Sequence, residues 1–231
     1  TLTRIAVFCA QRDYLHIPLI IDQGLAPSIM ESLSYVAGPH RPIVLLPPRK
    51  RVQVAQLHWV SSAGFTQFEP RSGRVQPACG RSMFSPYALG LVRASILARV
   101  PNNSQTPKKI FLTRTSPARN AVNLPEVERV MEQHGYVRVD MGALSLIEQA
   151  QLAAGATHIV GISGAACANL IFAAPGTDLL ILTSVCEEAN YWYWQNIACA
   201  CGNVVRYCLG EPVGTHRFSV QRSFLVDIKV L

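Results

Sequence analysis

The stretch HIVGISGAACANLIFAAPGTDLLIL, residues 158–182, places a segment of small residues between two apolar runs. The runs at 158–161 and 178–182 have the length and composition of buried strands, and the small residues at 165–173 are typical of a short helix. Strand, helix and strand in this order predict a parallel βαβ unit. This stretch therefore indicates an α/β fold.

The same alternation continues on both sides of this stretch. Asn123 with Glu126, and Ser145 with Glu148, have the spacing of N-terminal helix caps. These signals predict helices over residues 124–135 and 145–154, and further apolar runs predict strands over residues 109–113, 136–140 and 204–207. Because helices connect parallel strands across both faces of a sheet, we expect a doubly wound sheet in the second half of the chain.

The first hundred residues show a similar alternation. Apolar runs predict strands over residues 4–9, 42–47 and 64–68, and periodic segments predict helices over residues 18–36, 52–63 and 87–100. Residues 70–83 are rich in Arg, Gly, Pro and Ser and are predicted to form a loop. Residues 101–107 are polar and rich in turn formers, so we expect two domains, residues 1–100 and 101–231.

Composition limits the classes of function. Apolar residues make up 49% of the chain and charged residues 15%, which favours a folded core over disorder. The formal charge is +7, and 17 of the 21 cationic residues are Arg, whose guanidinium groups match phosphate oxygens in pairs. Because only residues 49–51 form a basic run, we expect no nucleic-acid partner.

Two other features are given ordinary structural explanations. The seven cysteines include no C-x-x-C pair, so we expect buried thiols in a reducing compartment and no metal site. Residues 159–177 are nearly uncharged and have about the length of a membrane span. Gly161, Gly164, Asn169 and Pro175 interrupt this segment, so we expect a soluble chain.

Three candidate binding segments follow predicted strands of the second half, where open parallel sheets bind ligands. Arg114 and Arg119 would clamp an anion, with surface ion pairs as the alternative. Residues 161–169 would offer a diphosphate the free N–H groups of a helix start, although small residues also allow tight packing. Glu187 and Glu188 would hold sugar or ribose hydroxyls, or are simply solvated.

An ordered set of residues resembles glycosyltransferase family 61. The set comprises Ile110 to Arg114, Arg119, Asn123, Glu126, Gly135, Tyr136, Leu144, Ser145, Glu148, Gln149, Ala156, Ile159 to Gly161, Gly164, Ala165, Asn169 to Phe172, Pro175 and Gly176. Residues 191–207 also resemble the family's C-terminal stretch, and Tyr14-Leu-His16 resembles its Tyr-Gly-His-Trp segment. The family includes bacterial capsular-polysaccharide transferases, plant xylan xylosyltransferases and animal N-acetylglucosaminyltransferases.

This resemblance implies a GT-B architecture, in which two Rossmann-like halves with parallel sheets surround a cleft. It implies an inverting hexosyl- or pentosyltransferase that needs no metal and no cofactor, uses a nucleotide sugar (a UDP-linked one is expected) as co-substrate, and places the acceptor on residues 1–100. His16 would be the base that deprotonates the acceptor hydroxyl, because imidazole titrates near neutrality, with an ordinary helix-start or core histidine as the alternative. The donor would bind Arg114, Arg119, Ser163, Gly164, Ala165 and Asn169.

Two departures from the family pattern leave a second hypothesis open. Ser163 stands where the family usually has His, and residues 180–182 lack the family's Glu, a natural ribose ligand. Glu187 or Glu188 would have to replace that Glu. Without a replacement, the chain would be a catalytically degenerate member that acts as a nucleotide- or glycan-binding subunit.

The resemblance also implies partners and a place in the cell. The acceptor would be a glycan or a lipid-linked glycan of polysaccharide biosynthesis, such as a capsule. A bacterial enzyme of this kind would be cytoplasmic, with peripheral membrane association, and a eukaryotic one would lie in the Golgi lumen. The aromatic residues at 191–194 would stack on a sugar or a lipid-linked acceptor, or would fill the domain interface.

Overall fold

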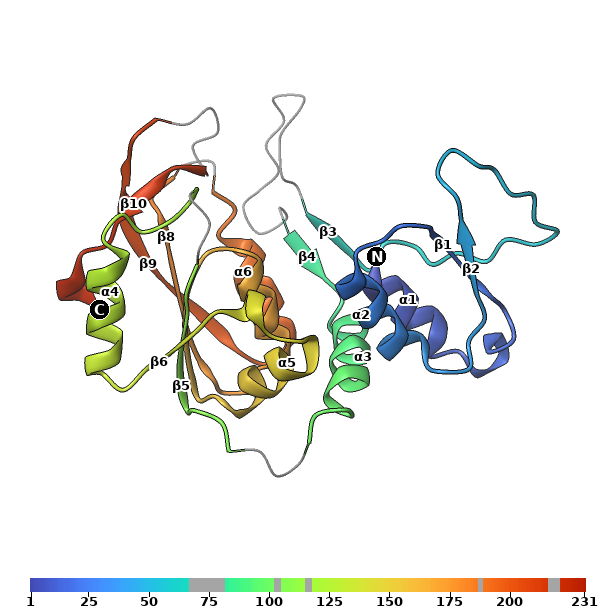
Figure 1. Ribbon diagram of the computed structural model, residues 1–231, viewed down its shortest axis with the longest axis horizontal. Helices are drawn as coiled ribbons and strands as arrows, with labels where there is room; N and C mark the ends of the chain where they lie inside the picture. Colours follow the sequence, from blue (N-terminus) through green and yellow to red (C-terminus); the bar gives the residue numbers. More distant parts are fainter. Residues whose placement is uncertain (67–81, 102–104, 115–117, 187–188, 216–220) are drawn as a thin grey trace.

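The structure is a computed structural model that describes residues 1–66, 82–101, 105–114, 118–186, 189–215 and 221–231. Figure 1 shows an elongated molecule in which a large sheet with its helices occupies one end and the helices and small sheets of the first half occupy the other. Within the described residues, no helix combines the length and apolar character needed to cross a bilayer. The six described cysteines all have free thiols.

The central sheet confirms the α/β prediction for the second half. Its strands are β5 (Lys109–Leu112), β6 (Val137–Val139), β7 (His158–Ile162), β8 (Asp178–Ser184), β9 (Val204–Val213) and β10 (Ser223–Leu225), in the order β10-β9-β8-β7-β5-β6. Only β10 is antiparallel to its neighbour, and the other pairs are parallel. The predicted strands all form here, and the inner strands β5 and β7 are buried over nearly their whole length, as a sheet covered on both faces requires.

Helices cover both faces of this sheet. The helices are α4 (Leu124–Gln133), α5 (Leu146–Gly155) and α6 (Trp192–Ala200), with 3-10 helices η3 (Met141–Ala143), η4 (Ala165–Phe172) and η6 (Ile228–Val230). On one face, Ile110 and Ile159 of the sheet share a core with α5, η4 and α6. On the other face, Phe111 and Val160 pack with α4. The doubly wound arrangement predicted for residues 101–231 is therefore present.

The two predicted helix caps have different outcomes. Ser145 and Glu148 form a complete capping box at the start of α5, as predicted. Asn123 does occupy the N-cap position of α4, but its side chain makes no cap hydrogen bond. It instead joins Val226 near the C-terminus, donating to the carbonyl at 2.9 Å and accepting from the amide at 3.1 Å. This tertiary pairing competes successfully with the local cap.

The first half contains two small, separate sheets. Its elements are α1 (Leu2–Cys9), η1 (Arg12–Tyr14), β1 (Leu19–Asp22), α2 (Pro27–Ala37), β2 (Ile43–Leu46), β3 (Gly64–Thr66), β4 (Ser82–Phe84) and α3 (Pro86–Leu97). β1 and β2 are parallel and joined through α2, whereas β3 and β4 form an antiparallel pair. The predicted strand at 42–47 is confirmed over Ile43–Leu46, and the predicted helix at 87–100 over Pro86–Leu97. The predicted strand at 64–68 is confirmed over Gly64–Thr66, and its last two residues lie outside the described residues. Residues 70–81 of the predicted loop lie outside the described residues, and its last two residues, Ser82 and Met83, belong to strand β4 instead.

Three predictions in the first half are wrong in whole or part. Residues 4–9 were expected to form a strand but belong to α1, because a short apolar run fits either period and here its buried side packs against α2 and α3. The helix expected over 18–36 begins only at Pro27, after strand β1 and a turn at Gly24 with φ 86°. The helix expected over 52–63 does not form. Its N-terminus would follow Lys50 and Arg51, whose charges oppose the helix dipole, and the segment has no regular secondary structure and is mostly exposed.

The two halves pack against each other through α3. Val92 and Ile96 of α3 belong to the same buried cluster as Ile110 of the central sheet. Arg93 of α3 donates from Nη1 to the carbonyls of Ile171 and Ala173, at 2.6 Å each. The predicted boundary at 101–107 includes residues 102–104, which lie outside the described residues. The division into two GT-B domains around a cleft is not confirmed and stays a prediction.

Candidate functional site

Three neighbouring parallel strands bring their carboxyl ends to one edge of the central sheet. β7 lies between β5 and β8, so the residues that follow these strands meet at the same edge (Figure 1). We call it the arginine edge and define it by Arg114, Arg119, Ser163 and Gly164. Glu187 and Glu188, which follow β8 in the sequence, lie outside the described residues.

Arg114 reaches from the end of β5 across to the loop after β7. Its Nη1 atom donates to the carbonyl of Ser163 at 3.3 Å. A Cβ atom placed on Gly164 would lie 2.0 Å from the same Nη1, so the guanidinium occupies the space that a side chain would fill. The absence of a side chain at Gly164 therefore makes room for Arg114, while the approach of a diphosphate to this backbone stays a prediction.

Arg119 sits on a strained and well-anchored turn. Its φ of 53° lies in the left-handed region, which costs a non-glycine residue of order 1 kcal/mol or more. Its amide donates to the carbonyl of Gln221 at 3.3 Å, and Asn120 donates from Nδ2 to the carbonyl of Arg114 at 3.2 Å. These contacts fix the end of the loop beside Arg222, a residue that sequence reasoning missed because it follows no predicted strand of the parallel sheet.

The arginine edge carries positive charge without a counter-charge among the residues that the structure describes. Burial lowers the pKa of Arg114, and the nearby charge of Arg119 lowers it further, so the two guanidinium groups are close enough to repel each other. The Nε atoms of Arg114, Arg119 and Arg222 are all buried without a hydrogen-bond partner. The ion pairs of the described residues join Arg138 with Glu128 and Arg206 with Asp178 instead. An anion with several acceptor oxygens would satisfy this arrangement.

Ser163 connects the arginine edge with α6. Trp194 of α6 donates from its indole Nε1 to the Ser163 hydroxyl at 3.2 Å. Tyr193 packs edge-on against Trp194, with ring centroids 4.6 Å apart, and against Phe84 of β4 at 5.4 Å. These contacts favour the second of the two expectations for the aromatic segment, that it packs between the halves, and Trp194 also touches the arginine edge.

The helix η4 begins at the arginine edge and carries two residues that were predicted to bind the donor, one exposed and one buried. Ala165 is exposed at the first position of the helix, where backbone N–H groups have no partner within the helix. Asn169 is only 6% exposed, and its amide donates to Gln149 at 2.9 Å and to the carbonyl of Ala166 at 3.1 Å. Its role in donor binding therefore stays a prediction, while a structural role is visible. Burial raises the pKa of Cys167 to about 11, so this thiol stays protonated at neutral pH.

His16 is not brought to the arginine edge. It is exposed in the loop between η1 and β1, which lies at the opposite end of the molecule from the central sheet (Figure 1). Arg41 anchors this loop by donating from Nη1 to the carbonyls of Tyr14 at 2.6 Å and Ile17 at 3.0 Å. The loop that carries His16 is thus held in place, but a catalytic role for the imidazole stays a prediction.

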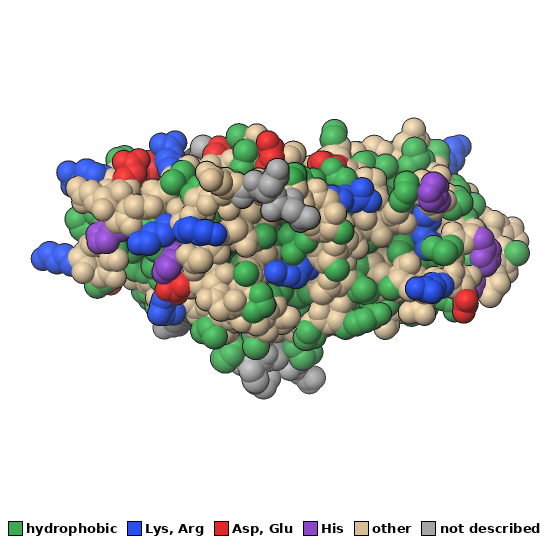
Figure 2. Space-filling model, turned by 90° about the horizontal axis from the view of Figure 1, so that it is seen from below, with side chains coloured by type: hydrophobic (Ala, Val, Ile, Leu, Met, Phe, Trp, Pro, Cys, Tyr) green, Lys and Arg blue, Asp and Glu red, His purple; other side chains and the backbone are tan. Residues whose placement is uncertain are grey.

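Other expected ligand classes are not decided by the structure. Among the described residues, no group of three or more His, Cys, Asp or Glu side chains is placed to hold a metal ion. Figure 2 views the molecule from below and shows Lys and Arg side chains spread along its length rather than gathered into a stripe. Independence of metals and of nucleic acid both remain predictions.

Comparison with known proteins gives one family. The model of the family described as Glycosyltransferase 61 matches residues 27–180. The match covers the whole arginine edge and ends before Trp194, and it begins after His16. A search of curated proteins finds no match to this chain.

Proposed function

The chain belongs to glycosyltransferase family 61, as its sequence resemblance predicted, and we propose that it takes the transferred sugar from a nucleoside diphosphate bound at the arginine edge. Family membership supports glycosyltransferase activity in general, with a sugar donor and a glycan acceptor. The diphosphate would lie between the guanidinium groups of Arg114 and Arg119 and the first N–H groups of η4. A UDP-linked sugar is the donor that we propose first.

One observation carries this proposal. Arg114 and Arg119 are half-buried, repel each other, and have buried Nε atoms without partners, while the described residues place no carboxylate between them. Keeping two such cations together is unfavourable unless a ligand supplies negative charge and acceptor oxygens. A diphosphate supplies both.

The same arrangement would assist the chemical step. An acceptor oxygen attacks the anomeric carbon, the bond from that carbon to the β-phosphate oxygen breaks, and the diphosphate leaves with added negative charge. Guanidinium groups and helix N–H groups aimed at those oxygens stabilise the charge as it develops. We therefore propose transfer without a metal, because the two arginines take the role of a bound cation.

We further propose that the transfer inverts the anomeric configuration in a single displacement, with His16 taking the proton of the acceptor hydroxyl. This role requires the anchored loop of His16 to approach the arginine edge when both substrates are bound. Closure of a GT-B cleft would provide that movement. The acceptor that we propose is a glycan or lipid-linked glycan of polysaccharide biosynthesis, such as a capsule, handled at or near a membrane.

The test is release of nucleoside diphosphate from UDP-, GDP- and ADP-linked sugars, with and without glycan acceptors. CMP-linked sugars, which would release CMP, are assayed in parallel. We expect turnover of one donor, loss of turnover in Arg114→Ala, and normal turnover in Arg129→Ala, which removes an exposed arginine of α4. Turnover that survives in Arg114→Ala would contradict the proposed site. A donor that binds but is never turned over would favour the degenerate, binding-only member of the family.

A further inference from the structure

A concave site lies far along the chain from the arginine edge. It is a pocket of about 290 Å³ between the C-terminal end of α1 and the extended segment 57–60. Its walls include the rings of Phe8, Tyr14, His58 and Trp59, together with the side-chain amide of Gln11. We call it the aromatic pocket. Its volume is close to the lower end of the range of ligand-binding pockets.

Three of the rings of the aromatic pocket, those of Phe8, Tyr14 and His58, pack against one another. Phe8 and Tyr14 stack with centroids 5.3 Å apart, and the His58 ring lies 5.2 Å from Tyr14. Arg41, which is only 7% exposed, contacts two of these residues. Its guanidinium lies 5.4 Å from the Phe8 ring centroid, and its Nη1 donates a hydrogen bond to the carbonyl of Tyr14 at 2.6 Å. A preformed wall of this kind loses little conformational entropy when a ligand binds.

The chemistry of the walls selects the class of ligand. Trp59 is 75% exposed and Tyr14 is 36% exposed, so both offer ring faces to solvent. Gln11 and His58 add hydrogen-bonding groups at the same place. A sugar ring matches this combination, because its C–H face packs on aromatic rings while its hydroxyls bond to amide and imidazole groups. A hydrocarbon chain would leave the polar groups of the walls unsatisfied.

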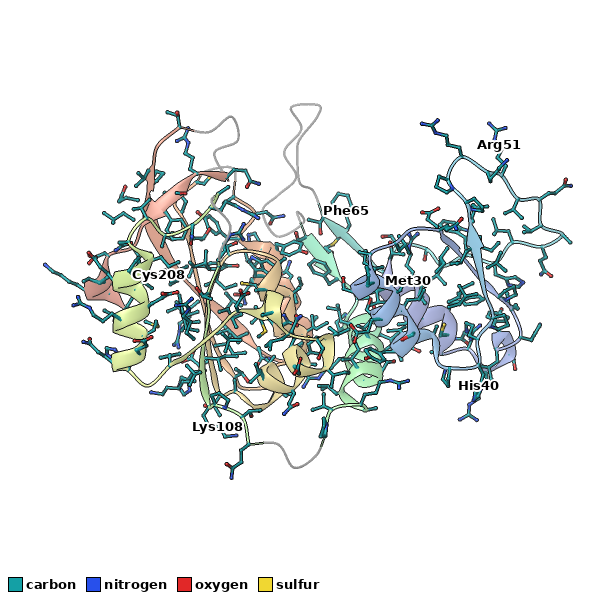
Figure 3. All side chains as sticks on the ribbon, in the orientation of Figure 1. Met30, His40, Arg51, Phe65, Lys108 and Cys208 are labelled. Carbon is teal, nitrogen blue, oxygen red and sulfur yellow. The ribbon has the colours of Figure 1, made fainter. Side chains whose placement is uncertain are left out.

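The aromatic pocket is connected to the arginine edge by continuous contacts. It shares Val7 and Val60 with a larger neighbouring pocket of about 500 Å³, whose lining includes Phe84. Phe65, labelled in Figure 3, lines the same pocket and projects from β3 between the two halves of the molecule. From Phe84 the contacts run through Tyr193 and Trp194 to Ser163.

We propose that the aromatic pocket is a subsite for the acceptor, which binds one sugar ring of the acceptor beside the loop that carries His16. The acceptor is then an oligosaccharide chain, laid across the larger pocket towards the arginine edge. The identification of this sugar as part of an acceptor rests on the proposed transferase function, whereas the binding of a sugar ring to the pocket does not.

The test measures the binding of tri- and tetrasaccharides of glucose, galactose, mannose, xylose and N-acetylglucosamine. Binding is detected by saturation-transfer NMR in samples without nucleotide. We expect at least one to bind the wild type and Trp59→Ala to weaken that binding about tenfold, the effect of losing one stacked ring. Trp59→Phe keeps a ring and should retain most of the affinity. Val204→Ala, which removes an equally exposed apolar side chain of β9, should leave binding unchanged.

Trp59 is exposed, so its truncation leaves the core intact. Failure of every oligosaccharide to bind, or binding that Trp59→Ala leaves unchanged, would overturn the pocket assignment. Nucleoside diphosphates are titrated into the same samples, so the two proposals fail separately. Nucleotide binding without sugar binding would contradict only the proposed subsite. Sugar binding without nucleotide binding would contradict only the proposed donor site.

Discussion

At the scale of single residues, the arginine edge depends on the absence of one side chain. Gly164 has an extended backbone with φ 175°, which any residue adopts, so no backbone strain requires glycine here. The requirement comes from Arg114, whose Nη1 occupies the position of the missing Cβ. The sequence shows a glycine after a strand, but it cannot show that an arginine 50 positions earlier fills the space.

We predict that Gly164→Ala preserves the fold and weakens nucleotide binding. The added methyl group displaces the end of a flexible arginine side chain, which costs little stability but moves a phosphate ligand. Calorimetric titration of the nucleotide that binds best would show a drop of about tenfold or more in affinity, as expected for losing one charge-assisted hydrogen bond. Gly90→Ala is the matched control, because a Cβ on Gly90 meets no atom within 4 Å. Equal affinities for Gly164→Ala and the wild type would contradict the positioning of Arg114.

At the scale of elements, the capping box of α5 gives a pH-dependent contribution to stability. Hydrogen bonds from Ser145 lower the pKa of Glu148 below its usual value. A carboxyl group whose pKa is lower in the folded state than in the unfolded state stabilises the fold when the pH is above its unfolded-state pKa. That contribution is lost as the pH falls through the lower, folded pKa.

We therefore predict that Glu148→Ala lowers the free energy of unfolding at neutral pH and that the difference from the wild type shrinks in acid. Urea unfolding between neutral pH and the acid range of carboxyl titration would measure it. Glu132→Ala, which removes an exposed carboxylate of α4 with no side-chain hydrogen bond or ion pair among the described contacts, is the control variant. A difference for Glu148→Ala that stays constant with pH would argue against the capping role.

Elements of the second half were predicted well because several signals agree there. Long apolar runs, capping pairs and terminal glycines all mark the same boundaries around α4, α5 and β7. In the first half, α1 was mistaken for a strand and residues 52–63 for a helix, because short apolar segments take their structure from what they pack against. The sequence pointed to Arg114, Arg119 and Gly164 as candidates because they follow predicted strands. Arg222 and Trp194 have no local signal in the sequence that would place them beside these residues.

At the scale of the whole molecule, the contact between α3 and η4 joins the two halves. Arg93 provides two hydrogen bonds to carbonyls at the end of η4, which begins at the arginine edge. We predict that Arg93→Ala lowers the free energy of unfolding by about 2 kcal/mol, the typical effect of losing hydrogen bonds from a charged donor. Urea unfolding measures it, with Arg129→Ala as the control. A change as small as that of the control would mean that this contact does not hold the halves together.

The elongated arrangement also separates the proposed substrates. The donor would bind the central sheet, the acceptor would extend over the first half, and the loop between η1 and β1, which carries His16, lies at the far end from the central sheet (Figure 1). A transferase with this layout needs closure before reaction, whereas a binding subunit does not. Sequence patterns predicted the two halves, but the relative position of the halves depends on side chains such as Arg93 that carry no pattern.

The measurement that tests the central claim most directly is thermal unfolding with UDP, GDP, ADP and CMP, on the wild type, Arg114→Ala and Arg129→Ala. A nucleotide at about a hundred times its Kd adds roughly 2.7 kcal/mol to the free energy of unfolding. We predict such a stabilisation for one nucleoside diphosphate, equal in the wild type and Arg129→Ala and lost in Arg114→Ala. Stabilisation that persists in Arg114→Ala, or none with any nucleotide in a well-folded sample, would contradict a donor site at the arginine edge.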